Sequence, residues 1–467
     1  MRTSALNKEN IYTLAKEYFA REDIRAQAIS DLAEIIAIPS VASERDGNFP
    51  YGKECAKALD KAEELAKNYG FTVENHEYHC MSVLFGDSEK EVGIVCHLDV
   101  VPAGEGWSVE PYGLTVDGEL LLGRGTHDDK GPFIQALYTL RFFKENNIKL
   151  PFSIRLILGS DEEVGSTDLE YFVTVRKPPI FSFTPDSEFP VCIGEKSILS
   201  IEAEFGFESD SIKEIIGGTV ANAVPGRAFA IVETEKELVC SDNITVLKTE
   251  NGFKIEAEGK AAHAAMPESG VNAISLLLSY LIENGLAEEN SLLDLIKDST
   301  SEYLGKTLGI NAENEDFGYV TCVGGVISAK DGSLVQSYNI RHLPENKPEE
   351  LVSAIENAVA RFGGKVNTVA ESEGYFVSAD DPKIKALTDA CEAVLGIECT
   401  PYTMGGGTYA RWLPNTVAFG SGIESQRKFL GGERGNAHQR DEYISKYELF
   451  AGMEIYSRAI FNLSDVI

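Results

Sequence analysis

The sequence predicts an α/β fold: a central mixed, mostly parallel β-sheet flanked by helices, into which a second, α+β domain is inserted. Two observations lead to this prediction. In the first part of the chain, short apolar runs typical of buried strands alternate with longer segments of helical periodicity, as in βαβ units. After Glu195 this pattern gives way to a different mixture of strands and helices, and it returns beyond Tyr375.

Helices and strands alternate in the first part of the chain. Apolar residues recur at helical spacing over residues 10–38, 54–68 and 132–146. Pro39 and Gly70 follow the first two of these segments as helix stop signals. The predicted strands are residues 93–101, 153–159 and 180–184.

The rest of the chain divides into an insertion and a closing segment. We predict that residues 196–380 form the inserted domain and that residues 1–195 and 381–467 together form the α/β domain. The predicted elements of the insertion include strands 228–232 and 252–258 and helices 271–284 and 349–362. The closing segment contains helices 381–395 and 445–461 and a short strand at 416–420.

Composition excludes several classes of protein. The chain has 467 residues, 43% of them hydrophobic and 25% charged, which is typical of a folded globular protein. The formal net charge of −32 repels phosphate backbones and anionic headgroups, so we expect neither a nucleic-acid partner nor a membrane. The eight cysteines are scattered without a C-x-x-C pair, and the N-terminal sequence has no signal-like apolar core. The expected location is the reducing cytoplasm.

Histidine and carboxylate side chains occur near the ends of predicted elements. His97 lies in an HLD string near the end of a predicted strand, where the two-residue period places Asp99 on the same side. A carboxylate beside an imidazole can turn its other nitrogen toward a metal ion. In GRGTHDDKGP, Asp128 and Asp129 precede a predicted helix. Two such carboxylates fit a cation, although a solvated turn at a helix N-terminus would also explain them.

Three further motifs add to this set. Glu162 and Glu163, in SDEEVGS, follow the predicted strand 153–159, and Asp186, in PDSEFP, follows the next one. Binding sites of open α/β sheets form at this edge. His438, in NAHQRDE, comes from the closing segment. Each motif alone is also compatible with a surface or structural role, but five such motifs together indicate one site.

The residue types indicate which cations would suit this site. Carboxylate and imidazole ligands favour Zn²⁺, Mn²⁺ or Co²⁺ over ions that prefer thiolates. Charge counting supports a pair of ions, because the carboxylates of Asp128, Glu163 and Asp186 and one hydroxide match two divalent cations.

At these motifs the sequence resembles the metallopeptidases of the aminoacylase/carboxypeptidase G2 class, most closely the PepV-type dipeptidases of peptidase family M20. The resemblance spans nearly the whole chain. The matching strings are HLDVVPAGEGW, GRGTHDDKGP, GSDEEVGS, PDSEFPVCIGEK, HAAMPESGVNA and GGGTYAR.

The resemblance implies a ligand set for two divalent ions, with Zn²⁺ as the first choice and Mn²⁺ or Co²⁺ as alternatives. One ion would be held by His97, Asp128 and Asp186, and the other by Asp128, Glu163 and His438. Asp128 would therefore bridge the two ions, and the Asp128–Asp129 peptide bond would be cis.

The resemblance also implies catalytic and substrate-binding residues. Glu162 would be the general base, and Asp99 would orient His97. The inserted domain would be a lid, in which Asn222 and His263 donate to an oxyanion. Arg341 and the glycine loop Gly405, Gly406 and Gly407 would bind the carboxyl end of the substrate.

The expected activity is that of a broad-specificity dipeptidase, in which a metal-activated water cleaves a dipeptide that has a free N-terminus. The chain would act as a monomer, with a dimer as the alternative. One competing hypothesis is an N-acyl amino acid deacylase or succinyl-diaminopimelate desuccinylase, and another is a non-catalytic metal- or peptide-binding relative. Two positions depart from the family pattern, since His127 stands where a small or apolar residue is common and His342 where an aromatic residue is usual.

Overall fold

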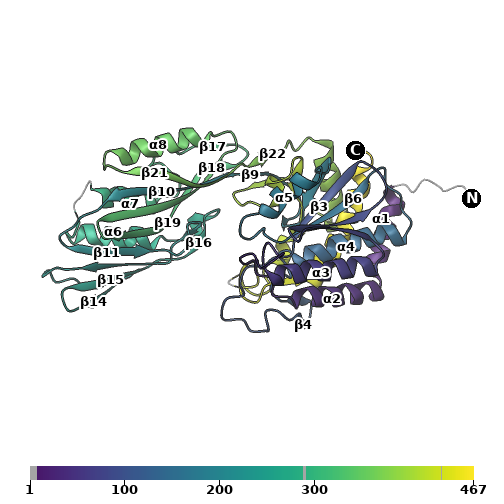
Figure 1. The fold of residues 1–467 in the computed structure, drawn as a ribbon, viewed down its shortest axis with the longest axis horizontal. Coiled ribbons are helices and arrows are strands. Elements are labelled where there is room, and N and C mark those ends of the chain that lie inside the picture. The colour runs from purple at the N-terminus through teal and green to yellow at the C-terminus, as the bar shows by residue number, and fades with distance from the viewer. Residues whose placement is uncertain (1–7, 288–290, 433) are drawn as a thin grey trace, which may run out of the picture. The chain divides into compact units, whose positions relative to one another are not determined.

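The computed structural model describes residues 8–287, 291–432 and 434–467, which fold into two compact units (Figure 1). The first, here called the α/β unit, contains the described residues up to Ile193 together with Val377–Tyr402 and Thr408–Ile467. The second, the inserted unit, contains Gly194–Phe376 and Thr403–Gly407.

The α/β unit is built on a mixed sheet, which confirms the predicted fold class. The strand order is β1-β2-β6-β3-β7-β24-β9, and the chain passes into the inserted unit within β9. The central strands β6, β3, β7 and β24 run parallel, whereas the flanking pairs are antiparallel. The bounds are β1 Thr72–His76, β2 Cys80–Phe85, β3 Glu91–His97, β6 Ser153–Gly159, β7 Phe181–Thr184, β9 Cys192–Glu195 and β24 Thr416–Ala418.

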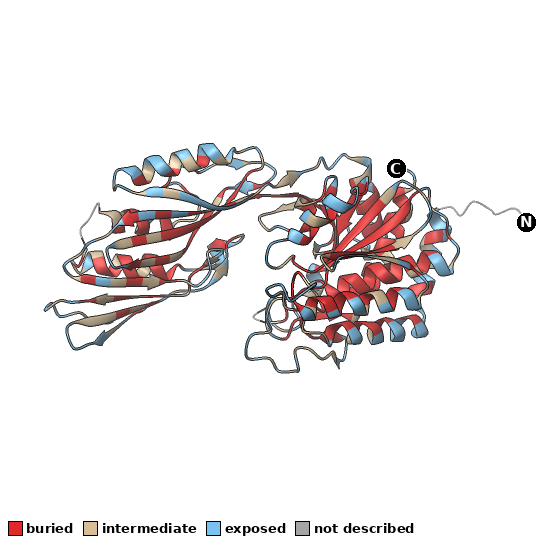
Figure 2. Ribbon diagram, viewed as in Figure 1, coloured by how far each residue is buried: buried red, intermediate tan, exposed pale blue. Residues whose placement is uncertain are grey.

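Helices pack on this sheet and on one another. Helix α4 packs against β3 and β6, and α2 and α10 pack against α4, while α3 contacts β1 and β2. Strand β6 and most of α4 are buried, as Figure 2 shows in red. The helices are α1 Lys8–Ala20, α2 Glu22–Ile36, α3 Lys53–Asn68, α4 Lys130–Glu145, α5 Thr167–Val175, α9 Pro382–Leu395 and α10 Lys446–Leu463.

The helix predicted over residues 10–38 is divided in the structure. Helix α1 ends at Ala20 and α2 begins at Glu22, because Arg21 between them has an extended backbone with φ −65° and ψ 131°. The apolar periodicity continues through this break, so it gave no sign of the division. None of the helices that the structure describes combines the length and the apolar character needed to span a bilayer.

Two small sheets in the α/β unit contain strands that adjoin or overlap the site motifs. Strands β4 (Thr115–Asp117), β5 (Leu120–Leu122) and β26 (Tyr443–Ser445) form one of them. Strands β8 (Ser187–Glu188) and β25 (Ser421–Gly422) form the other. Strand β8 begins directly after Asp186, so this pairing ties the PDSEFP segment to the closing part of the chain.

The inserted unit is an eight-stranded antiparallel sheet with helices on one face. The strand order is β14-β15-β13-β11-β19-β20-β10-β21. Along β10 the residues Leu199, Ile201, Ala203 and Phe205 are buried, and they share one core with apolar residues of α6, α7 and α8. The bounds are β10 Ser197–Gly206, β11 Ile212–Gly217, β13 Arg227–Val232, β14 Ile244–Lys248, β15 Phe253–Glu258, β19 Thr321–Lys330, β20 Ser333–His342, β21 Lys365–Ser372, α6 Ala273–Glu283, α7 Leu292–Ser301 and α8 Pro348–Ala360.

Candidate active site

Three neighbouring parallel strands bring site residues to one edge of the central sheet. His97 is the last residue of β3, Glu162 and Glu163 follow β6, and Asp186 follows β7. Because these strands run parallel in the order β6-β3-β7, their carboxyl ends meet. His97 Nε2 accordingly lies 3.9 Å from Asp186 Oδ2.

Asp128 connects this strand edge to the closing part of the chain. It stands just before α4, and its peptide bond with Asp129 is cis. Its Oδ1 lies 2.9 Å from His97 Nε2, and its Oδ2 lies 3.0 Å from His438 Nε2. The same His438 nitrogen lies 3.0 Å from Glu163 Oε2. One carboxylate is thus placed between the two histidines.

Two groups of side chains in the described part of the chain have ligand atoms close enough to hold a metal ion. One group is His97, Glu162 and Asp186, and the other is His97, Asp128 and Glu163. Within each group the ligand atoms lie within 4.8 Å of one another. The structure therefore brings the five predicted ligands together and places Glu162, the predicted base, among them.

The electrostatics of this cluster fit a cation. Burial raises the pKa of Glu162 and of Asp186 well above its usual value, and the Asp128 charge adds to this shift in both. The buried atom Glu163 Oε1 makes no hydrogen bond, and His97 Nε2 faces the carboxylates of Asp128 and Asp186. Carboxylates that repel one another beside an imidazole nitrogen form a donor set that divalent ions such as Zn²⁺ favour.

Nearby carboxylates, Asp128 among them, raise the pKa of both His97 and His438. Burial lowers the pKa of His97, but the contacts with Asp128 and Asp99 outweigh burial and raise this pKa well above its usual value. The His438 side chain is 55% exposed, and its partial desolvation opposes protonation, but Asp128 and Glu163 raise its pKa to about 11. At neutral pH the metal-free protein therefore carries protons on both imidazoles.

Asp99 supports the site in two ways. The predicted strand 93–101 included Asp99. In the structure β3 ends at His97, so Asp99 lies in the loop that follows the strand. His97 Nδ1 lies 3.0 Å from the Asp99 main-chain oxygen and 3.5 Å from Asp99 Oδ1. The Asp99 carboxylate also accepts hydrogen bonds from the backbone N–H groups of Glu162 and Glu163, at 3.3 and 3.0 Å. Asp99 therefore contacts His97 and the acidic loop together.

Glu442 is a supporting residue that the sequence analysis missed. Its Oε1 accepts hydrogen bonds from the backbone N–H groups of Gly125, His127 and Asp128, at 3.0, 2.9 and 3.1 Å. Its Oε2 lies 2.5 Å from Arg124 Nη1 in an ion pair that is almost completely buried. The only local signal was its place within the NAHQRDE string, four residues after His438.

We expect Glu442→Gln to lower the free energy of unfolding by about 3 to 5 kcal/mol, because the variant leaves the Arg124 cation buried without a countercharge. Urea unfolding of chelator-treated protein measures this change. Glu424→Gln is the matched control, since the Glu424 side chain is 82% exposed. Equal unfolding midpoints for the two variants would contradict the role given to Glu442.

The inserted unit gathers the residues that the resemblance assigned to the lid. Strands β12 (Ala223–Val224) and β16 (Ala262–His263) pair so that Ala223 lies opposite His263, and Ala264 N donates to Asn222 O at 3.0 Å. Asn222 and His263 are therefore neighbours on this two-stranded ribbon. Both are exposed in this structure.

Arg341 and the glycine loop are linked to the same ribbon. Thr321 Oγ1 donates to Ala264 O at 3.2 Å, and Thr321 pairs with Arg341 across β19 and β20. Arg341 is buried, and its Nη1 donates to Gly405 O at 3.3 Å. A Cβ atom added at Gly405 would lie 3.4 Å from Ala265. A chain of contacts thus joins Asn222, His263, Arg341 and Gly405 within one unit.

The glycine loop falls in the inserted unit and not in the closing segment of the α/β domain, where the predicted boundaries placed it. Thr403–Gly407 groups with the inserted unit because Lys196 N donates to Met404 O at 3.0 Å and Thr403 Oγ1 donates to Asp316 O at 2.5 Å. Gly406 and Gly407 follow Gly405 in this segment, which ends at Gly407. These interactions join residues far apart in the chain, so local sequence patterns carry no sign of them.

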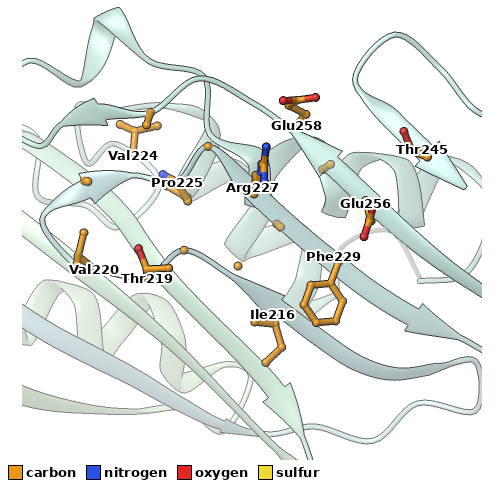
Figure 3. Close-up of a pocket in the computed structure, with 17 residues that line it drawn as sticks. Ile216, Thr219, Val220, Val224, Pro225, Arg227, Phe229, Thr245, Glu256 and Glu258 are labelled. Atoms are coloured by element: carbon orange, nitrogen blue, oxygen red, sulfur yellow. The ribbon is translucent and has the colours of Figure 1, made fainter. Parts of the chain in front are cut away.

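A cavity of 870 Å³ lies beside this ribbon in the inserted unit (Figure 3). Val220, Val224 and Arg227 line one part of it, and Phe229 and Glu256 line another. Neither Asn222 nor His263 is among its lining residues. The cavity therefore does not contain the predicted oxyanion donors.

The two departures from the family pattern lie outside both metal-ligand groups in the described residues. Burial, with the charge of Arg427, lowers the pKa of His127 to about 3, so this side chain stays neutral at the pH of the cell. The His342 Nδ1 atom lies 3.0 Å from the Leu343 main-chain oxygen. Neither histidine is needed to account for the cluster.

The fold and the cluster define a class of protein: an α/β domain with an acidic and histidine-rich site at a strand edge and an inserted second unit. Comparison with known proteins identifies the family. The model of peptidase family M20/M25/M40 matches residues 93–462. The chain belongs to this family and is a hydrolase that acts on peptide bonds.

Particular relatives and solved structures are similar to this chain over nearly its whole length. "Putative dipeptidase YtjP" of Bacillus subtilis (strain 168) is 30% identical over 458 residues, covering 93% of this chain and 97% of that protein. The solved structure of the dipeptidase Dug1p from Saccharomyces cerevisiae aligns with a TM-score of 0.62 at 15% identity, over 98% of this chain and 99% of that one. Bacillus subtilis YXEP, described as a dinuclear metal binding peptidase from the M20 family, aligns with a TM-score of 0.52 at 11% identity, over 96% of this chain and 100% of the other.

Proposed function

We propose that this chain is a broad-specificity dipeptidase that depends on two divalent metal ions and uses Glu162 as its general base. The observation that carries the proposal is the placement of Asp128 between His97 and His438, with one oxygen near each imidazole. A carboxylate in that position suits a bridge between two ions. The dipeptidase name of YtjP and the description of YXEP as a dinuclear metal binding peptidase agree with this function.

His97, Asp128 and Asp186 would hold one ion, and Asp128, Glu163 and His438 the other. Zn²⁺ is the first choice for these nitrogen and oxygen ligands, with Mn²⁺ or Co²⁺ as alternatives. Such a pair of ions supplies a water molecule of lowered pKa and polarises the scissile carbonyl group.

Glu162 would take a proton from the attacking water and pass it to the leaving amine. Burial raises the pKa of this carboxylate well above its usual value, and a base of raised pKa is suited to hold a proton between two steps. Its ligand atom lies within 4.8 Å of those of His97 and Asp186, so Glu162 would be close to an ion that these residues hold. Asp99 would fix the position of the Glu162 backbone relative to the His97 ring.

The inserted unit would supply the substrate contacts. Asn222 and His263 would donate hydrogen bonds to the oxyanion of the tetrahedral species, and each such donor is worth about 3 kcal/mol. Arg341 and the loop Gly405, Gly406 and Gly407 would bind the carboxylate of the substrate. The contacts that join these residues within one unit support a common role.

One assay distinguishes the dipeptidase activity from the competing activity, which is the removal of an acyl group from an N-acyl amino acid. We expect Ala-Ala and β-Ala-His to be cleaved in the presence of metal at a kcat/KM at least about 100-fold above that for N-acetyl or N-succinyl amino acids, because the site would select a free amine. A preference for the blocked substrates would overturn the dipeptidase proposal. A protein that binds metal and peptide without cleaving either class would be the non-catalytic relative.

Metal binding should release protons. The His438 pKa of about 11 and the raised His97 pKa keep both imidazoles protonated at pH 7 in the metal-free chain, whereas a metal ion binds the neutral imidazole. We therefore expect the release of at least about two protons per chain, one from each imidazole, and a metal affinity that rises with pH. Isothermal titration calorimetry in buffers of different ionisation enthalpy measures this number. A binding enthalpy that does not depend on the buffer would contradict the expectation.

We further propose that the enzyme acts as a monomer in the cytoplasm. The eight cysteines are all free thiols in the structure, and seven of them are buried, which suits a reducing compartment. Light scattering of the metal-loaded protein tests the oligomeric state, and a dimer at micromolar concentration would overturn the first part of this proposal.

A further inference from the structure

The loop that carries Glu162 and Glu163 is held by two buried carboxylates outside the predicted ligand set. Four consecutive backbone N–H groups, from Ser160 to Glu163, donate to them. Asp99 accepts the last two, and Asp168 Oδ2 accepts those of Ser160 and Asp161, at 2.6 and 3.0 Å. The backbone of the acidic loop is therefore fixed residue by residue.

Asp168 is itself held in one orientation. It lies in the first turn of α5 and is completely buried. Its second oxygen, Oδ1, accepts a hydrogen bond from Leu169 N at 2.7 Å, so both oxygens are engaged. A carboxylate with this many partners has no freedom to turn away from the loop.

Tyr409 joins Asp168 to the predicted metal ligand His97. Its hydroxyl group donates to the same Asp168 oxygen that holds Ser160 and Asp161. Its ring meets the His97 ring edge to face, with the centroids 6.1 Å apart and the planes at 89°. Tyr409 is completely buried, so this contact lies in the interior of the α/β unit.

The chain leaves room for this arrangement at Gly159, the last residue of β6. A Cβ atom at that position would lie 1.9 Å from the Tyr409 hydroxyl oxygen and 2.3 Å from Asp168 Oδ2. A side chain of any kind would therefore displace the pair. The space beside β6 is matched to the Tyr409 and Asp168 side chains.

We propose that Asp168 and Tyr409 are positioning residues for the hydrolysis reaction, holding the acidic loop and the His97 ring in the geometry that catalysis and metal binding require. The proposal rests on the proposed function of the cluster. Supporting residues of metal ligands change metal affinity or activity about 10- to 100-fold when they are replaced. A displacement of about 1 Å at Glu162 or Glu163 is enough for an effect of this kind.

A purely structural role is the alternative, and the chain offers a matched control for it. Tyr138 is also completely buried, and its hydroxyl group donates to a buried carboxylate, Asp31 Oδ2, at 2.8 Å. Tyr138 lies on α4 and Asp31 on α2, outside the site. Tyr138→Phe therefore removes the same kind of hydrogen bond from the same unit.

The experiment compares Tyr409→Phe with Tyr138→Phe in the full chain loaded with Co²⁺. The visible absorption of bound Co²⁺ reports the geometry of its ligands without any substrate. We expect Tyr409→Phe to change this spectrum and to lower kcat on Ala-Ala about 10- to 100-fold, with KM within twofold of wild type. Tyr138→Phe should leave the spectrum and kcat unchanged, even where the two variants lose similar thermal stability. Matching spectra and kcat values for the two variants would overturn the proposal.

Asp168→Asn provides the second variant. Because Tyr409 acts through the Asp168 carboxylate, the double variant should be no more impaired than the more impaired single one, and additive effects would overturn this coupling. The spectrum separates failure of this inference from failure of the proposed function. A wild-type chain that binds Co²⁺ but cleaves no dipeptide would overturn the dipeptidase proposal alone, whereas a chain that binds no Co²⁺ would overturn both.

Discussion

Glu162→Gln lowers kcat on a dipeptide by about 100- to 10,000-fold in the metal-loaded enzyme, if Glu162 is the base that moves the proton. Glutamine has nearly the same shape but cannot accept the proton of the attacking water. The Asp99 hydrogen bond to the backbone of residue 162 is retained, so the loop should keep its place. A discontinuous assay of dipeptide cleavage measures kcat, and the metal content is determined on the same sample.

Metal content decides between two roles for Glu162, because its side chain also lies in one of the two groups able to hold an ion. A base can be removed without loss of metal, so Glu162→Gln should keep both ions. Glu170→Gln is the control, since Glu170 is an exposed acid on the first turn of α5. A variant that loses one ion would show that Glu162 is a ligand, and one with wild-type kcat would remove it from the mechanism.

The second large effect is expected at the bridging position. Asp128→Asn should weaken binding of both ions by more than about 100-fold, since even supporting residues around metal ligands cost 10- to 100-fold. The amide keeps the shape of the side chain but loses the charge that faces His97 and His438. Activity at limiting metal should fall below detection and return only in part with excess metal.

Metal titration followed by elemental analysis measures this loss. Asp31→Asn is the matched control, because Asp31 is a buried aspartate of the same unit that accepts hydrogen bonds from Tyr69 and Tyr138. If Asp128→Asn loses only one of the two ions, the bridging role is wrong and Asp128 serves a single ion.

The sequence was sufficient to predict the fold class and the residues that the structure gathers at the strand edge. The apolar run predicted a strand at residues 153–159, which are the bounds of β6 in the structure, and the loop after that strand carries Glu162 and Glu163. Parallel strands bring such loops together, so the apolar runs that predicted the strands also indicated where the site would form. The roles of these residues remain predictions until they are tested.

Of the supporting residues, Asp99 was predicted, but the roles of Glu442, Asp168 and Tyr409 could not be, because their partners are remote or carry no distinctive local pattern. Glu442 holds the backbone of residues 125–128 across more than 300 residues of chain, and Tyr409 reaches Asp168 across 241. A buried carboxylate that accepts backbone N–H groups has the same local sequence as an acid on the surface. The break at Arg21 was missed for a related reason, since apolar spacing continues through it.

The grouping of Thr403–Gly407 with the inserted unit has a practical consequence for protein engineering. The polypeptide crosses the boundary between the units four times, after Ile193, Phe376, Tyr402 and Gly407. An exchange of the insertion between family members at two junctions alone would leave the glycines behind and break their fit to Arg341 and Ala265. A chimaera built to transplant substrate preference should therefore carry two separate stretches of donor sequence.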